Sequence, residues 1–411
     1  MGTGVARLQV VALGLGAALL APLAIINAVA PLYTLVALLA VAALIAGRGW
    51  RGVPRVPLLL ALALLGWAAL SILWAVDPAR SARGWASLAL SIAGGLALFA
   101  AADALSSDGR ARVGRALALG TIAALLPLTI EAIARMRGWT PTPQQWLLEG
   151  MGFAYGPHQL NRVAALVAIA VWPAAAILAR RMGWRRAWLL PAWAACVLPA
   201  FDSAAALLAL ICAAATFVLA VAIDAWRPRA LRILAPAAIA IGVAAMPMLP
   251  NWEPFRARFT ERAQGVSIWH RAEIWSFVAT RIAERPLLGW GLDSARSMPG
   301  GKDLIDGRAE RLPLHPHNNI LQLWLELGLP GAALMALLAS AVARRACAQA
   351  DRAGRLALLA ALAAALAVAA TGYGVWQAWW MGALWIVASA ARAAFGGVAP
   401  GPASHGRTER A

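Results

Sequence analysis

Apolar residues fill this chain in long runs, and short polar turns separate one run from the next. A run of about 20 apolar residues is long enough to cross a bilayer as an α-helix. The pattern therefore predicts an all-α polytopic transmembrane protein with about twelve spans. The predicted spans are Leu8–Ala28, Leu32–Ala46, Val56–Val76, Trp85–Ala102, Val113–Ala134, Leu160–Ala179, Ala187–Phe201, Ser203–Ile223, Leu231–Leu249, Asn318–Val342, Leu356–Gly372 and Val375–Ala394.

The same pattern divides the chain into four parts. Residues 1–250 hold nine predicted spans, residues 251–317 form one long loop that contains helices, residues 318–395 hold three spans, and residues 396–411 form a tail. The spans show almost no ionisable residues, and Glu131 and Asp202 fall near span ends. Ion-coupled transporters usually keep such residues within the membrane, so we expect the chemistry in the long loop.

Composition limits the class of protein. Hydrophobic residues make up 62% of the 411 and charged residues 13%, which excludes an intrinsically disordered chain. The net charge is +18, but the arginines stand in short clusters between apolar runs, so we do not expect nucleic acid as a partner. The three cysteines show no pairing or metal-ligand spacing and are expected to be free thiols.

The arginine clusters also predict orientation, because short cytoplasmic loops carry an excess of positive charge. With twelve spans, most clusters fall on one side, together with both termini, and the long loop falls on the other. The clusters on the predicted cytoplasmic side are Arg48/Arg51/Arg55, Arg110/Arg112/Arg115, Arg180/Arg181/Arg185/Arg186, Arg227/Arg229/Arg232, Arg344/Arg345/Arg352/Arg355 and Arg392/Arg407/Arg410. A smaller outer segment, residues 135–158, is expected to form a short helix in the membrane interface.

Within the long loop, Ser267–Glu284 has the periodicity of an amphipathic helix, with Ser267 as a plausible N-cap. Arg271 falls in the middle of the apolar face that includes Ile274 and Trp275. A cation there either reaches lipid headgroups or binds an anion above the membrane, and an arginine near a helix N-terminus suits phosphate. A turn rich in proline and glycine follows at Arg285–Ala295.

Two histidines, His315 and His317, stand directly before the apolar run that begins at Asn318. Metal binding is not favoured, because no Cys, Asp or Glu lies nearby at ligand spacing. An interfacial location and a general-base role both remain open. Imidazole can take a proton from a hydroxyl group at neutral pH.

The segment that starts at His317 resembles the signature of the O-antigen ligase and polymerase superfamily, which also includes protein O-oligosaccharyltransferases. Its ligase form is His followed by Asn, Ser or Gln, nine residues, Gly, two residues, and Gly or a similar residue. This chain matches it in full with His317, Asn318, Gly328 and Gly331. Three other features resemble the family: Arg271-x-x-x-Trp275, the sequence PLLGWG at residues 286–291 and the span start at residues 160–162.

The resemblance implies transfer of O-antigen glycan from undecaprenyl diphosphate to the lipid A–core of lipopolysaccharide, at the periplasmic face of a Gram-negative inner membrane. In this interpretation His317 is the general base and the reaction inverts the anomeric carbon. Arg271 binds the diphosphate, without a metal, a cofactor or an obligate protein partner. The expected partners are the lipid-linked donor, the lipid acceptor and membrane lipids. Supporting roles are expected for His315, Asn318, Gln322 and Trp275.

The chain departs from the family at one point. Many members carry a Ser-Arg pair where this chain has Ser203-Ala204. Arg162, at the start of the preceding long span, is the candidate replacement for the missing cation, with an ordinary interfacial arginine as the alternative.

Three other functions remain open from the sequence. Within the family they are an O-antigen polymerase and a protein O-oligosaccharyltransferase. The complete ligase spacing and the modest outer loop favour a ligase over both. From another class, the chain could be a transporter or flippase of lipid-linked saccharide, which would not require His317.

Overall fold

The structure is a computed structural model, and it describes residues 3–24, 27–47, 55–152, 156–259, 266–305 and 307–396. The arginines at positions 48, 51, 407 and 410 therefore lie outside the described residues. The α-helices are α1 (Thr3–Ala24), α2 (Val29–Gly47), α3 (Arg55–Leu70), α4 (Pro78–Asp103), α5 (Ser107–Met136), α6 (Pro143–Gly150), α7 (Pro157–Met182), α8 (Trp184–Ala187), α9 (Leu189–Val197), α10 (Ala204–Trp226), α11 (Leu231–Ala245), α12 (Glu253–Phe259), α13 (Val266–Glu284), α14 (Asn319–Cys347), α15 (Arg352–Thr371) and α16 (Ala378–Phe395). The 3-10 turns are η2 (Ser71–Trp74), η3 (Leu198–Ala200), η4 (Met246–Asn251) and η6 (Ser294–Ser297), and β1 (Leu304–Ile305) pairs antiparallel with β2 (Ala309–Glu310).

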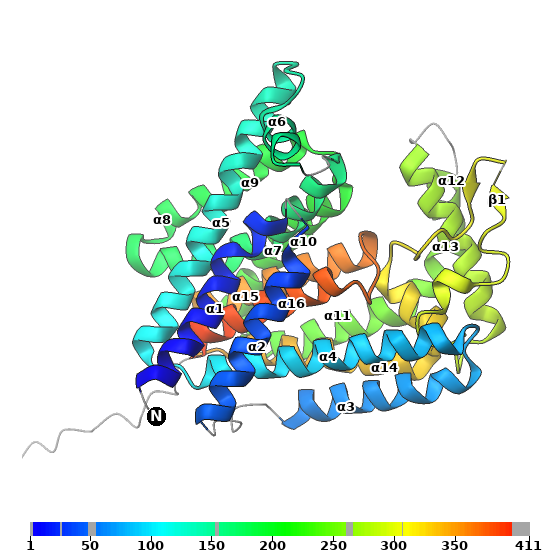
Figure 1. The fold of residues 1–411 in the computed structure, drawn as a ribbon, viewed down its shortest axis with the longest axis horizontal. Coiled ribbons are helices and arrows are strands. Elements are labelled where there is room, and N and C mark those ends of the chain that lie inside the picture. Colours follow the sequence, from blue (N-terminus) through cyan, green and yellow to red (C-terminus); the bar gives the residue numbers. More distant parts are fainter. Residues whose placement is uncertain are drawn as a thin grey trace, which may run out of the picture.

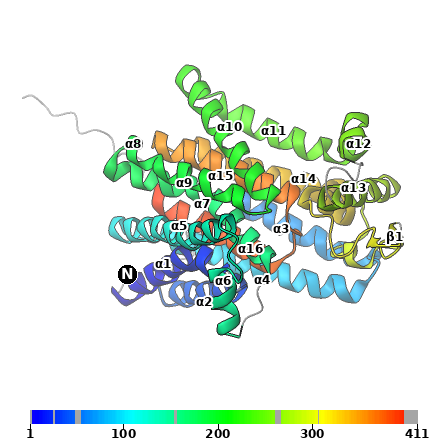
Figure 2. The ribbon, with the colours of Figure 1, turned by 90° about the horizontal axis from the view of Figure 1, so that it is seen from above.

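The long helices form one bundle and run roughly along a common direction (Figure 2). In the described part of the chain, ten helical segments are long and apolar enough to cross a membrane. This supports the prediction of an all-α polytopic membrane protein. The ten segments correspond to α1–α5, α7, α10, α11 with η4, α14 and α15.

Two of the twelve predicted spans are not among these ten. The predicted span Ala187–Phe201 is broken into α8, α9 and η3. Its longest piece, α9, has 9 residues, which gives a helix of roughly 14 Å, about half the thickness of a bilayer core. The last predicted span forms α16, a helix of 18 residues in which three tryptophans and Arg392 lower the mean hydropathy. The count of twelve therefore stays a prediction.

α7 is the central helix and the most deeply buried of the ten segments. Its residues from Val163 to Ala176 are apolar on every side of the helix, and the side chains of this stretch are buried. A helix that is apolar all round is expected in the interior of a bundle rather than at its surface. Small residues allow close approach elsewhere, as at Gly120 on α5, where a Cβ atom would lie 2.5 Å from the Ala18 carbonyl oxygen of α1.

Salt bridges tie several helices together at one end of the bundle. They join residues that the positive-inside rule places on a single side, so the contacts agree with the predicted grouping of these helix ends. The pairs are Asp103–Arg392 at 2.7 Å, Asp224–Arg352 at 2.8 Å, Asp224–Arg355 at 2.9 Å and Asp351–Arg180 at 2.5 Å.

The long predicted loop forms a small folded unit. α12, α13 and the β1–β2 hairpin lie together at the end of the bundle where α3 connects to α4 (Figure 1). The predicted helix Ser267–Glu284 is confirmed as α13, which begins one residue earlier. Ile274, Trp275, Val278 and Ile282 are buried against this unit and α14, as the periodicity predicted.

Candidate active site

The start of α14 sets the position of His317. Asn318 is the N-cap, and its side-chain oxygen accepts hydrogen bonds from the backbone N–H groups of Ile320 and Leu321, both at 3.0 Å. Such capping satisfies donors that have no partner within the helix, which is why asparagine is favoured at this position. His317 directly before it has a positive φ of 54°, an uncommon conformation for a residue other than glycine.

The imidazole of His317 binds the end of α15. Its Nδ1 atom lies 2.9 Å from the carbonyl oxygen of Gly372. A carbonyl oxygen can only accept, so Nδ1 carries the proton of the neutral ring and Nε2 keeps a lone pair. Among the described residues, no hydrogen bond to Nε2 is present. This nitrogen is therefore available to accept a proton.

The charge state of His317 follows from its surroundings. Burial lowers the pKa of His317 below its ordinary value of 6.5, and the nearby Arg271 cation lowers it further. The hydrogen bond to Gly372 opposes this shift, because it stabilises the protonated ring. The imidazole is thus neutral at physiological pH, which is the form that a general base requires.

Arg271 also contacts the end of α15. It lies in the first turns of α13, and its Nη1 donates a hydrogen bond to the Thr371 carbonyl oxygen at 2.6 Å. Burial lowers the pKa of Arg271 from 12.5, with Tyr373 opposing, yet an arginine remains a cation at neutral pH. One nitrogen of this half-buried guanidinium is therefore bound to the protein backbone. Adjacent backbone carbonyls thus hold Arg271 and His317.

Trp275 lies one helical turn after Arg271 and supports the histidine segment. Its indole Nε1 donates to the Pro316 carbonyl oxygen at 2.8 Å. Phe255 of α12 stacks on the indole, with ring centroids 5.8 Å apart and planes 9° apart. Two residues of α13 therefore hold the site: Trp275 fixes the backbone before His317, and Arg271 contacts the end of α15.

Arg162, at the start of α7, contacts the first turn of α16. Its guanidinium bonds to Asn27 and lies over the Trp379 ring, 5.2 Å from the ring centroid. The Trp379 ring in turn contacts Tyr373 at 4.5 Å between centroids. Burial raises the pKa of Tyr373, while Arg162 and Arg271 both act to lower it. Tyr373 therefore lies within electrostatic reach of both predicted phosphate-binding arginines.

His315 packs beside His317 as a buried, neutral neighbour. The two rings are 4.4 Å apart, and His315 Nδ1 accepts the backbone N–H of His317 at 3.1 Å. Burial, followed by the charge of His317, lowers the pKa of His315 to about 3. Its Nε2 contacts the Gln377 amide at 3.0 Å, and Gly374 leaves room for the ring, since a Cβ atom there would lie 2.9 Å from it. His315 thus links the backbone of His317 to the α15–α16 loop.

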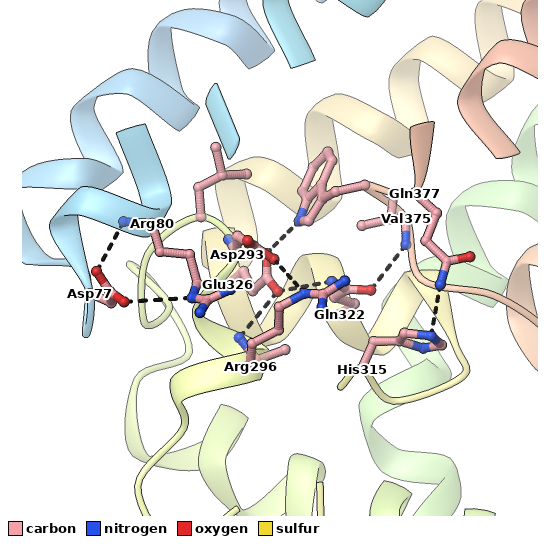
Figure 3. A network of polar contacts seen from close by, with 12 residues as sticks. Asp77, Arg80, Asp293, Arg296, His315, Gln322, Glu326, Val375 and Gln377 are labelled. Atoms are coloured by element: carbon pink, nitrogen blue, oxygen red, sulfur yellow. Dashed lines mark hydrogen bonds and ion pairs between the residues drawn. The ribbon is translucent and has the colours of Figure 1, made fainter. Parts of the chain in front are cut away.

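A second polar network extends from Gln322, one turn into α14, away from the two histidines (Figure 3). The Gln322 side-chain oxygen accepts the Val375 N–H at 3.0 Å, and its amide donates to Glu326 at 2.9 Å. Glu326 is completely buried and connects through Asp293 to a surface cluster that contains Arg80 and Arg296.

The two signature glycines, Gly328 and Gly331, determine the shape of α14. At Gly328 the helix kinks with φ 61° and ψ −160°, and at Gly331 a Cβ atom would lie 2.2 Å from the Leu327 side chain. Pro330 follows the kink and has no N–H to donate to the preceding turn. The kink leaves backbone groups of this turn without partners inside the helix.

The segment Pro286–Gly291 supplies those partners. Trp290 N–H donates to the Leu325 carbonyl at 2.9 Å, and Gly291 N–H donates to the Glu326 carbonyl at 2.8 Å. In return, the Leu329 N–H donates to the Pro286 carbonyl at 2.9 Å. The predicted turn is therefore confirmed, and it docks against the kink.

Sequence reasoning missed Glu326, Tyr373 and Gln377. For Glu326 a signal was present, because it is the one ionisable residue of the apolar run 319–343. We expected almost no ionisable residues in the spans and did not consider Glu326. An ionisable residue within a span often marks a functional site. Tyr373 and Gln377 lie in the short gap between two predicted spans, where nothing in the spacing marked them.

The site histidines are not arranged as metal ligands. Over the described ranges, no three His, Cys, Asp or Glu side chains are grouped as a metal ion would require. His315 and His317 are occupied by backbone and amide contacts at Nδ1 of both rings and at Nε2 of His315.

These features define a polytopic helical membrane protein with a histidine–arginine site at one end of its bundle. A family model described as "O-Antigen ligase" matches residues 189–336, which include Arg271, His317 and both signature glycines. The resemblance seen in the sequence is thereby confirmed.

Curated relatives agree with this match. A protein of Rickettsia felis named "Putative polysaccharide ligase" is 27% identical over 78% of this chain and 76% of its own length. Relatives with the same descriptive name from Rickettsia prowazekii and Rickettsia conorii are 28% and 27% identical, over 78% and 70% of this chain and 76% and 69% of their own lengths. The chain is thus similar to the O-antigen ligase family over residues 189–336, and over most of its length to proteins named as polysaccharide ligases. The family indicates polysaccharide ligase activity and thus a glycosyl-transfer enzyme.

Proposed function

We propose that this chain is an O-antigen ligase that transfers glycan from undecaprenyl diphosphate to the lipid A–core of lipopolysaccharide. One observation carries the proposal: a half-buried, neutral His317 with its Nε2 lone pair available lies beside the Arg271 cation. A base next to a cation suits a reaction in which a hydroxyl is deprotonated while a diphosphate leaves.

The reaction proceeds in one displacement. His317 Nε2 takes the proton of an acceptor sugar hydroxyl, and the oxygen attacks the anomeric carbon of the donor. The bond from this carbon to the diphosphate oxygen breaks as the new glycosidic bond forms, so the configuration at the anomeric carbon inverts. Arg271 and Arg162 stabilise the charge that develops on the diphosphate. No metal is required for these steps.

The location follows from the substrates. Both are lipids whose sugar ends meet at the periplasmic surface of an inner membrane, so the folded unit of α12, α13 and the hairpin would face the periplasm. The positive-inside pattern supports this orientation, with both termini on the cytoplasmic side.

A deletion strain separates the ligase from its alternatives within the family. Loss of a ligase leaves uncapped core lipopolysaccharide while polymerised glycan accumulates on the carrier. Loss of a polymerase would instead leave caps of a single repeat, and loss of a protein-directed transferase would leave lipopolysaccharide unchanged. Lipopolysaccharide gels and analysis of extracted carrier lipid distinguish these outcomes.

Complementation with His317→Ala separates an enzyme from a transporter. We expect this variant to be made at normal levels and to lose capping, since removal of a general base lowers a rate by ~10²–10⁴. A transporter of lipid-linked saccharide would keep its function. His270→Gln is a matched control, because His270 lies on α13 and contacts the Glu310 backbone rather than the α15 end.

A further inference from the structure

Glu326 is a buried carboxyl group in the first third of α14, and all of its hydrogen bonds come from donors. It is 0% exposed. Its Oε1 accepts from the Gln322 amide at 2.9 Å and the Ala295 N–H at 3.3 Å, and its Oε2 accepts from the Asp293 N–H at 2.7 Å and the Trp376 indole at 2.5 Å. A carboxylate group can accept all four of these hydrogen bonds. The side-chain amide of a glutamine here would place its NH2 group against some of the same donors, so those hydrogen bonds would be lost.

The donors come from three separate parts of the chain. Asp293 and Ala295 lie at the start of η6, after the docked turn. Gln322 belongs to α14 itself, and Trp376 belongs to the α15–α16 loop. Figure 3 shows Glu326 at the centre of these segments, with Asp293 on one side and Gln322 on the other. Gln322 extends the hold on the α15–α16 loop, because it also accepts the Val375 N–H at 3.0 Å. One side chain therefore joins three segments beneath the site.

The α15–α16 loop that Glu326 holds is the one on which the site is built. Gly372 of this loop accepts the hydrogen bond of His317 Nδ1, and Thr371 directly before it accepts that of Arg271. Gln377, at its other end, contacts His315, which in turn accepts the N–H of His317. The loop of residues 372–377 is short, so a hold on Val375 and Trp376 constrains the carbonyls that orient the base and the cation.

We propose that Glu326 is a positioning residue of the transfer reaction, which acts through residues 372–377 to fix the orientation of His317 and Arg271. This inference rests on the proposed function for the reaction itself. Glu326 touches neither substrate nor reacting atoms in this scheme. Its loss should change the geometry of His317 while the folded bundle remains.

The test compares Glu326→Gln with wild type in a purified two-substrate transfer assay. Glu284→Gln is the control, since Glu284 lies on the exposed side of α13 in a surface ion pair with Arg281. We expect Glu326→Gln to lower kcat at least about tenfold, which corresponds to about 1.4 kcal/mol of transition-state stabilisation, with a smaller change in KM. Trp376→Phe removes one of the four donors and keeps an aromatic ring, so it should act in the same direction more weakly.

A second readout reports the geometry of His317 without any turnover. The Gly372 hydrogen bond raises the pKa of His317, so a displaced loop should lower that pKa. Labelling of His317 by diethyl pyrocarbonate, followed by peptide mass spectrometry between about pH 5 and 8, gives the midpoint of its titration. The midpoint should move to lower pH in Glu326→Gln and stay unchanged in Glu284→Gln.

The outcomes separate the two proposals. A wild-type kcat and an unmoved labelling midpoint in Glu326→Gln would overturn the positioning role. If Glu326→Gln does not fold, Trp376→Phe decides, and a wild-type kcat and midpoint in that variant would overturn the role equally. If wild type transfers no glycan while the midpoint moves as expected, the proposed reaction fails and the positioning of His317 by Glu326 stands.

Discussion

His317 Nδ1 and the Gly372 carbonyl oxygen lie 2.9 Å apart, and this contact joins the start of α14 to the end of α15. It fixes both the tautomer and the direction of the imidazole. The last carbonyls of a helix carry partial negative charge, so the same helix end also suits the Arg271 guanidinium beside it. A base and a cation are thus held by neighbouring backbone groups.

The acid limb of the pH–rate profile should lie below pH 6.5. Burial and Arg271 lower the pKa of His317 from 6.5, and only the neutral ring accepts a proton, so activity is lost as the pH falls through the lowered pKa and is full above it. His315, with a pKa of about 3, stays neutral through this range and cannot produce the limb. The measurement is kcat/KM against pH with purified protein, because this ratio reports the pKa of the free enzyme.

Arg271→Ala provides the control for this assignment. It removes a cation that lowers the pKa of His317, so the acid limb of its residual activity should move to higher pH. A limb that stays in place in this variant would mean that another group titrates.

Substitution of Arg271 by lysine should impair transfer strongly. The Arg271 guanidinium already uses one nitrogen for Thr371 and can present the others to two phosphate oxygens, which a lysine ammonium cannot copy. We expect transfer to fall about 10- to 100-fold, the effect of losing a hydrogen bond to a charged group of ~1.5–3 kcal/mol. Arg271→Ala should be no better. The readout is transfer at matched protein levels in membranes.

Arg308→Lys is a matched control, since Arg308 is an exposed arginine of the hairpin in the same unit. It should transfer at the wild-type rate. Near-normal transfer by Arg271→Lys would show that only a positive charge is needed there, and the diphosphate role of Arg271 would be withdrawn.

Local periodicity predicted the elements that depend on nearby residues. The helix 267–284 is α13, Asn318 caps α14, and the turn 285–295 forms no α-helix, because side-chain spacing and turn residues decide these structures. The buried face of α13 followed from the same spacing. Arg271 also fell on that face, but its partner could not be read from the sequence.

The partners of the site residues depend on contacts between distant segments. Thr371 is 100 positions from Arg271 and contributes a backbone carbonyl, which every residue type carries. Spacing therefore gives no signal for it. Arg162 was a candidate because it lies at a span end. Its contact with Trp379, whose ring contacts Tyr373, can be seen only in the packed bundle. The predicted span count is not confirmed at the two places where the helices are short or rich in tryptophan.

Transfer should persist in excess chelator. In the ranges that the structure describes, no cluster of three metal-ligating side chains is present, and the arginines can take the role of a metal at the diphosphate. The experiment adds EDTA to the purified two-substrate assay, with EDTA saturated by magnesium as the control for effects of the chelator on the lipids. Loss of transfer with EDTA and recovery with free magnesium would contradict a metal-independent mechanism.

The kink of α14 gives a prediction for stability. Gly328 has φ 61° and ψ −160°, a backbone conformation open essentially to glycine alone, and a Cβ atom there would lie 2.3 Å from the Leu287 carbonyl oxygen. The docked turn is equally crowded: a Cβ atom added at Gly289 would lie 2.5 Å from the Glu326 carbonyl oxygen of α14. Any side chain at Gly328 must therefore push the docked turn away from α14.

Gly328→Ala should lower the free energy of unfolding by at least ~1–3 kcal/mol, the cost of the backbone conformation alone, with the clash adding to it. The turn that it displaces leads to Asp293 and Ala295, which donate to Glu326, so capping of lipopolysaccharide should fall together with stability. Gly66→Ala is the matched control: Gly66 lies inside α3, where an added Cβ atom would meet no other atom within 4 Å, so alanine there should be neutral or slightly stabilising. Thermal unfolding in detergent measures both. Equal melting temperatures for the two variants would mean that Gly328 is present for a reason other than the kink.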